Sequence, residues 1–154
     1  MSSNDRTTPI GLFLFAYAYA EAAEVLRNAD TNAGHRDAPI RYLFTHAVEL
    51  YLKAYLRAKG LTIDELRRRP YSHDTKSLLE KSEEFGLYLT LDLVSQIEFI
   101  ANDTSDRYIV TGTKKVLLLN SFSHLCESLH DRICPDVLKA EGLTRAPFPY
   151  GRPS

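Results

Sequence analysis

The sequence predicts a single all-helical domain, and three observations lead to that prediction. Apolar residues recur with the α-helical period of about 3.6 residues through almost the whole chain, without strand-like alternation. Helix-starting and helix-ending residues bound these stretches, and the connections are mostly short. The length of 154 residues is that of one domain. We therefore expect an up-and-down bundle of about five helices over residues 1–140, followed by a flexible Pro/Gly-rich tail over 141–154.

The first two expected helices carry the clearest apolar stripes. Thr8 is the expected N-cap of the first, with Pro9 at its first position. The second begins near Asp37 and ends at Gly60. The expected buried positions are Leu12, Phe15, Ala16, Tyr19, Ala23 and Leu26 in the first helix, and Ile40, Leu43, Phe44, Ala47, Leu50, Tyr51, Ala54 and Ala58 in the second.

Three more helices are expected after a short charged connection that ends at Pro70 and has room for one helical turn. Ser72 is the expected N-cap of the third helix and Thr90 that of the fourth. The fifth is expected from about 115 to 134, where Pro135 interrupts it. Their expected buried residues are Leu78, Leu79 and Phe85, then Leu93, Ile97, Ile100 and Ala101, then Leu118, Phe122, Leu125, Leu129 and Ile133.

The apolar content of the first two helices predicts a homodimer. Phe13, Tyr17, Tyr42 and Leu52 lie off the main stripes, where one bundle core would leave them uncovered. Exposed apolar surface of this kind marks an interface between proteins.

Charge and composition limit the kinds of partner. The chain has 19 basic and 20 acidic residues, so no overall field attracts it to nucleic acid or membranes, and any nucleic-acid contact must be local. The uncharged segment 10–20 could be mistaken for a signal-peptide core, but Asp5 cancels Arg6 and the segment is too short to span a bilayer. With two cysteines only, we expect a cytoplasmic protein that does not contact membranes.

Several polar residues occur in an order that resembles a known family. The second helix has the pattern A-x-E-x-x-L-K-A-x-L before Gly60, a His-Asp step opens the next helix, and an Arg-Tyr step follows the fourth. The matching residues are Ala47, Glu49, Leu52, Lys53, Ala54 and Leu56, then His73 and Asp74, then Arg107 and Tyr108. Over roughly residues 37–133 this order resembles HEPN domains, which are small helical bundles.

The resemblance implies a bundle that dimerises and pairs with a minimal nucleotidyltransferase in toxin–antitoxin systems, or acts in defence. Many members are metal-independent ribonucleases with an R-x4-6-H motif near the start of the last long helix. This sequence departs from that motif, because positions 112–114 after Arg107 read Gly-Thr-Lys and the next histidine is His124.

We therefore expect a binding module rather than an enzyme, with a polar site for a nucleotide, an RNA end or a partner protein. Its expected residues are Lys53, His73, Asp74, Arg107 and Tyr108. The guanidinium can bind phosphate and the tyrosine can stack on a base, whereas a structural arginine would instead tie its loop to a carboxylate. The imidazole of His73 could serve as a general acid or base, but a hydrogen-bonded histidine inside the bundle is the plainer interpretation.

Two alternatives remain open at this point. One is a ribonuclease with a displaced pair, in which His73 acts with Arg67, Arg68 or Arg107. The other is a structural homodimer without a ligand. A shared solvent-open cleft for His73 and an arginine would favour catalysis, whereas burial of Arg107 on a carboxylate would favour the structural alternative.

Other histidine patterns predict no site. Arg41 and His46 match R-x4-H, but five positions on a helix turn the two side chains to different sides. Residues 67–69 form an arginine run that is more typical of a solvated loop than of a phosphate patch. Cys126 and Cys134 flank His130 on one helix, about 12 Å apart along its axis, too far to share a metal. We expect neither metal nor cofactor.

Overall fold

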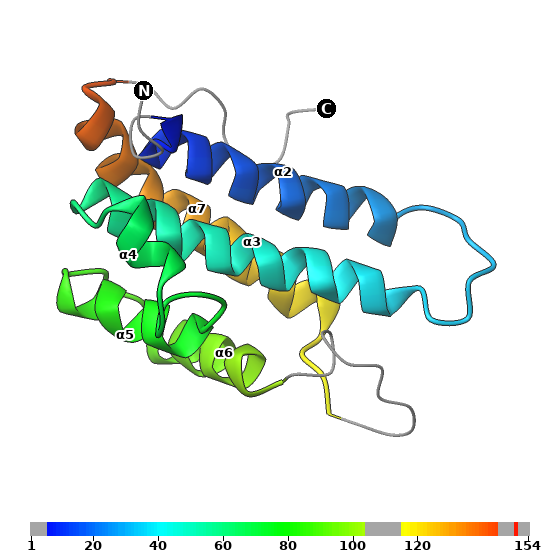
Figure 1. Ribbon diagram of the computed structural model, residues 1–154. Coiled ribbons are helices and arrows are strands. Elements are labelled where there is room, and N and C mark those ends of the chain that lie inside the picture. The colour runs from blue at the N-terminus through cyan, green and yellow to red at the C-terminus, as the bar shows by residue number, and fades with distance from the viewer. Residues whose placement is uncertain (1–5, 104–114, 145–149, 151–154) are drawn as a thin grey trace.

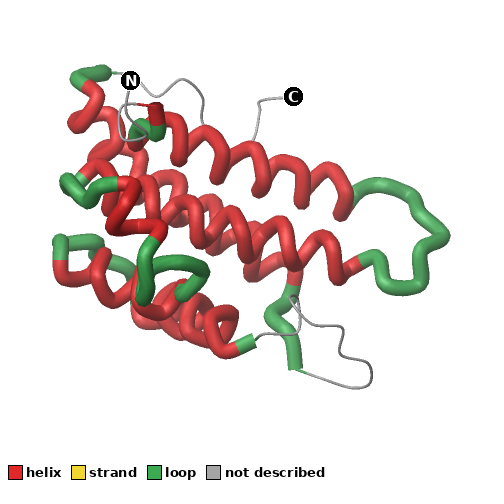
Figure 2. The backbone as a smooth tube through the Cα atoms, in the orientation of Figure 1, coloured by secondary structure: helices red, strands yellow, loops and turns green. Residues whose placement is uncertain are grey.

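The chain folds into an all-helical bundle (Figures 1 and 2), in a computed structural model that describes residues 6–103, 115–144 and 150. The described residues contain no strand, so the predicted fold class is confirmed. The helices are α2 (Pro9–Arg27), α3 (Asp37–Ala58), α4 (Ile63–Arg67), α5 (Thr75–Glu84), α6 (Leu91–Asn102) and α7 (Leu119–Glu141).

Three long helices, α2, α3 and α7, lie side by side (Figure 1). The shorter α5 packs on α3, and α6 packs on α5 and α7. Polar contacts show that α2 and α7 are antiparallel. Arg27 at the end of α2 donates to Ser123 and Asn120 near the start of α7. At the opposite end, the amide of Ile10 donates to Glu141 Oε1 at 3.4 Å.

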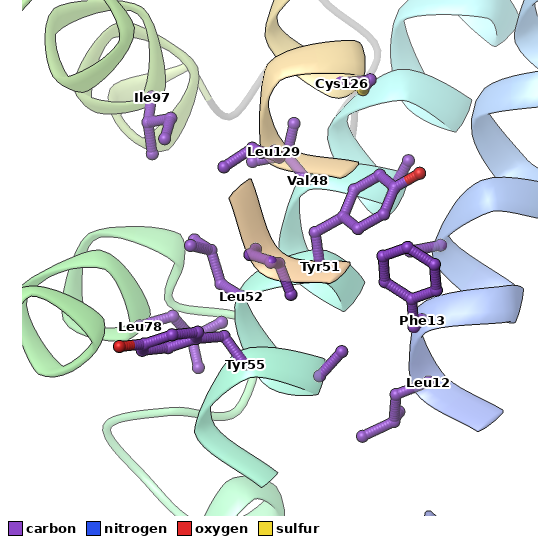
Figure 3. Packing of buried hydrophobic residues seen from close by; sticks show 14 of the residues in the cluster. Leu12, Phe13, Val48, Tyr51, Leu52, Tyr55, Leu78, Ile97, Cys126 and Leu129 are labelled. Atoms are coloured by element: carbon purple, nitrogen blue, oxygen red, sulfur yellow. The ribbon is translucent and has the colours of Figure 1, made fainter. Parts of the chain in front are cut away.

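Helix α3 is the centre of the bundle, because it contacts α2, α7 and α5. Figure 3 shows Tyr51 of α3, Phe13 of α2 and Leu129 of α7 converging on one interior. The rings of Phe13 and Tyr51 meet edge to face at 5.6 Å, and Leu52 faces the α5 side near Leu78. Complete burial of side chains of this size stabilises the fold by about 1.5–3 kcal/mol each.

The expected stripe on α2 is partly wrong. Phe15 and Leu26 are 64% and 42% exposed, whereas Phe13 and Tyr17 are buried. Because α2 is apolar on nearly every side, its sequence alone does not show which side faces α3 and α7. The helix is also long and apolar enough to cross a membrane by length and composition, a criterion that a core helix or signal sequence also meets.

The packing of α2 and α3 removes most of the reason for expecting a homodimer. Phe13, Tyr17 and Leu52 are buried within the single chain, and only Tyr42 of the four off-stripe residues is about half exposed. Three of the four residues expected to be uncovered are thus covered by the chain's own core, and the homodimer stays a prediction.

Two helix boundaries differ from the sequence-based ones. Asp74, not Ser72, is the N-cap of α5, because its carboxylate accepts from the amide and the hydroxyl of Ser77 at 3.2 and 2.8 Å. Helix α7 begins at Leu119 and continues through Pro135 to Glu141. The packing of residues on both sides of the proline offsets the hydrogen bond that its ring removes, and these buried residues are Ile133 and Val137.

The residue nearest the C-terminus that the structure describes packs on the bundle. The ring of Tyr150 lies 5.6 Å from that of Tyr17 and 5.4 Å from that of His130. At least one residue of the expected flexible tail thus contacts the core, while 145–149 and 151–154 lie outside the described residues.

Replacing Tyr150 tests whether this contact stabilises the fold. We expect Tyr150→Ala to lower the free energy of unfolding by about 1–3 kcal/mol, because it uncovers aromatic surface on Tyr17 and His130. Urea denaturation of both proteins measures the difference. Tyr88→Ala is the control, since Tyr88 is 83% exposed and its loss should change stability by less than about 0.5 kcal/mol. Equal midpoints for wild type and Tyr150→Ala would contradict the expectation.

Candidate functional site

A buried carboxylate on α3 gathers three nitrogen-bearing side chains. Glu49 is 5% exposed. Its Oε1 lies 2.9 Å from Lys53 Nζ and 3.2 Å from His73 Nδ1, and its Oε2 lies 3.7 Å from His46 Nδ1. Glu49 and Lys53 thus form an ion pair between neighbouring turns of α3 that is mostly buried, and two histidines contact the same carboxylate.

These partners keep Glu49 ionised. Burial by itself raises the pKa of this carboxyl group, but the contacts with His46 and Lys53 and the nearby charges of Lys53 and His73 outweigh it. The pKa of Glu49 is lowered from 4.5 to about 2. A carboxylate that is charged at neutral pH can hold both imidazole rings through their Nδ1 atoms.

Local structure explains how the cluster assembles. His46, Glu49 and Lys53 stand at successive turns of α3 and share one face of the helix. His73 comes from the connection before α5, where its φ of 60° places it in the left-handed region, which histidine tolerates better than most residues. Asp74 directly after it caps α5, and this cap fixes where the connection ends beside α3.

The cluster forms part of the wall of a cleft of about 710 Å³ between α3, the connection to α5 and the end of α6. His73 reaches solvent there, with 65% of its side chain exposed. On α3, the rings of Tyr42 and His46 are parallel to within 6°, with centroids 6.2 Å apart. The residues that line the cleft are Tyr42, Thr45, His46, Glu49, Arg69, Pro70, Ser72, His73, Asp74, Thr75, Ile100, Ala101 and Asp103.

The structure brings together three of the five residues that the sequence predicted for the site. His73 and Asp74 line the cleft, and Lys53 forms an ion pair with Glu49, which also lines it. The carboxylate of Asp74 also caps α5, so part of its role is structural. Arg107 and Tyr108 lie outside the described residues, and the expectations for them stay predictions.

Of the weaker catalytic candidates that the structure describes, His73 lines the cleft and Arg68 does not. Arg68 is exposed in the connection after α4 and is not among the residues lining the cleft, whereas its neighbour Arg69 is. The sequence analysis named Arg67 and Arg68 as possible partners of His73, and the fold instead places the adjacent Arg69 in the cleft.

Sequence reasoning missed His46. Arg41 turns away from it as expected, pairing with Asp37 at 3.4 Å and donating to the Leu117 carbonyl. His46 itself lines the cleft beside Glu49, a position that the sequence analysis did not predict. Its position three residues before Glu49 on a helix was the signal that could have identified it.

His130 of the second histidine pattern lies in the core. The Tyr51 hydroxyl and His130 Nδ1 lie 2.8 Å apart in the core, and the Sγ of Cys126 faces the Phe44 carbonyl at 3.9 Å. Burial raises the pKa of the Cys126 thiol. Over residues 6–103, 115–144 and 150, no group of three or more His, Cys, Asp or Glu side chains could hold a metal ion.

Comparisons with models of protein families, with curated proteins and with solved structures found no match for this chain. The HEPN resemblance therefore stays a prediction from the motif residues, and the geometry of the cleft is the basis for any functional inference.

The low pKa of Glu49 predicts a specific acid dependence of stability. A folded-state value below the unfolded value means that ionised Glu49 contributes stability above pH 4.5, and that this contribution is lost as the pH falls toward 2. We expect the free energy of unfolding to fall by up to about 3 kcal/mol across that window, and Glu49→Gln to lack this component. Urea denaturation at a series of pH values measures it.

A matched variant separates this effect from general acid unfolding. Glu80 is an exposed glutamate on α5, so Glu80→Gln should keep the wild-type acid dependence. Stability curves that run parallel for wild type and Glu49→Gln between pH 4.5 and 2 would show that Glu49 has an ordinary pKa.

Proposed function

We propose that the chain is a HEPN-like binding module whose cleft takes a phosphate-bearing ligand, either a nucleotide or the end of an RNA. The observation that supports this proposal is the convergence of His46, His73 and Arg69 on one open cleft. Imidazole and guanidinium groups are donors suited to phosphate oxygens, and arginine can bind them in a bidentate manner.

The charge of the cleft favours a local contact over a long polyanion. Lys53 offsets the negative charge of Glu49, and both imidazoles contact the same carboxylate. Arg69 also lines the cleft and can contact a ligand there. Asp74 and Asp103 also line the cleft and oppose a run of phosphates. This arrangement fits one terminal phosphate better than a nucleic-acid backbone, in agreement with the near-neutral charge of the chain.

The family resemblance extends the proposal to partners. HEPN-like modules of toxin–antitoxin or defence systems pair with a minimal nucleotidyltransferase and form homodimers. A chain of this kind would hold its ligand while a partner acts, and so would need no catalytic residues of its own.

Removing the cleft arginine tests the proposal. We expect Arg69→Ala to weaken the binding of AMP and of a short 5′-phosphorylated RNA about tenfold, because a charge-assisted hydrogen bond is lost. Isothermal titration calorimetry measures both. Arg68→Ala is the matched control, since it removes the same charge from the same connection without touching the cleft, and it should change the affinity less than twofold. Equal losses in the two variants, or no binding of either ligand, would refute a phosphate site in the cleft.

A metal-independent ribonuclease is the second candidate, and one observation favours it. His73 and an arginine, Arg69, line the same solvent-open cleft, and His46 supplies a second imidazole. Two imidazoles held by one carboxylate are groups that can serve as general base and general acid.

Cleavage of RNA in the presence of EDTA distinguishes the two candidates. If the cleft is catalytic, His73→Ala should lower the cleavage rate by about 10²–10⁴-fold. If it only binds, the purified wild type leaves single-stranded RNA intact while still binding it. Cleavage that is equal in wild type and His73→Ala would point to a contaminating nuclease.

A further inference from the structure

One wall of the cleft presents an aromatic surface. Tyr42 and His46 stand four residues apart on α3 with nearly parallel rings, and the ring of Tyr19 on α2 meets His46 edge-on at 4.4 Å. We call the Tyr42–His46 pair the aromatic ledge. Because its members belong to a long central helix and His46 is supported from α2, the ledge is held in a fixed position.

Tyr42 differs from the tyrosines that serve the core. Tyr51 and Tyr55 are buried, and their hydroxyl groups lie 2.8 Å from His130 Nδ1 and 2.9 Å from the Phe85 carbonyl. Tyr42, in contrast, is 48% exposed and lines the cleft. A half-exposed ring on a rigid element at a cleft can take a planar ligand group on its face.

The cleft combines apolar and cationic side chains from different elements. Tyr42 is on α3 and Ile100 and Ala101 are at the end of α6, whereas Arg69 and His73 come from the connection before α5. A volume of about 710 Å³ lies within the usual range for a site that takes one small ligand. A nucleoside monophosphate combines the two matching parts, a flat base and a charged phosphate, in one molecule of that size.

We propose that the cleft selects a nucleoside monophosphate unit, free or at the end of an RNA, by stacking its base on Tyr42 while Arg69 and His73 hold its phosphate. This inference rests on the proposed phosphate-binding function and adds the base as the selected group. Stacking depends on the face of a base and not on its edge, so the ledge favours nucleotides over other phosphates without specifying a sequence.

A pair of ligands isolates the contribution of the base. AMP and ribose 5-phosphate share the sugar and the phosphate, and we expect the wild type to bind AMP about five- to a hundredfold more tightly. Tyr42→Leu should bring the two affinities to within about twofold and leave that for ribose 5-phosphate unchanged. Tyr42→Phe keeps the ring and should keep the preference, and so should Tyr88→Leu, which alters an exposed tyrosine outside the cleft.

Circular dichroism tests whether each variant is folded. If Tyr42→Leu does not fold, Tyr42→Met takes its place. Equal affinities for AMP and ribose 5-phosphate in the wild type, or an unchanged preference in the variant without the ring, would overturn base stacking and leave phosphate binding intact. No binding of either ligand would overturn both proposals.

A further measurement distinguishes the source of the nucleotide. A 5′-phosphorylated adenosine tetranucleotide that binds more tightly than AMP, with an affinity that Tyr42→Leu weakens, supports the end of an RNA. Weaker binding than AMP supports a free nucleotide. Tetranucleotide binding that is insensitive to Tyr42→Leu contradicts stacking at an RNA end.

Discussion

The charge of Glu49 is the constraint on which the cleft side of the molecule depends. A carboxylate this deeply buried costs several kcal/mol in desolvation unless partners compensate it. Lys53 supplies one compensating group from the next turn of α3, and His73 supplies another from the connection before α5. The requirement to satisfy one charge therefore ties a segment of irregular backbone to the central helix, and it fixes the wall of the cleft.

Helix α3 can carry this charge because the rest of its surface is well packed. The hydroxyl groups of its two buried tyrosines have partners, because Tyr51 lies 2.8 Å from His130 Nδ1 and Tyr55 donates to the Phe85 carbonyl. The apolar bodies of the same residues fill the interior between α2, α7 and α5. One helix thus serves as core on most of its faces and as the support for a polar site on the remaining one.

Local signals in the sequence predicted the helices well, and contacts between distant segments limited the rest. The N-caps Thr8 and Thr90 were identified correctly because a cap depends on residues within one turn. The buried face of α2 could not be predicted from its sequence, because nearly all of its residues are apolar. Phe13 and Tyr17 are buried because they pack against His130 of α7. Of the site, His73 and Lys53 were predicted, but Arg69 was not, because only the folded connection distinguishes it from Arg68.

The hairpin of α5 and α6 is held to α3 at both ends of α5. His73 contacts Glu49 just before the helix begins, and the carbonyl of Phe85 accepts from Tyr55 just after it ends. A cleft wall that is clamped in this way has little freedom to rearrange around an incoming molecule. Association would then proceed without a slow closing step and with little loss of chain entropy, so the shape of the empty cleft would itself decide which molecules enter.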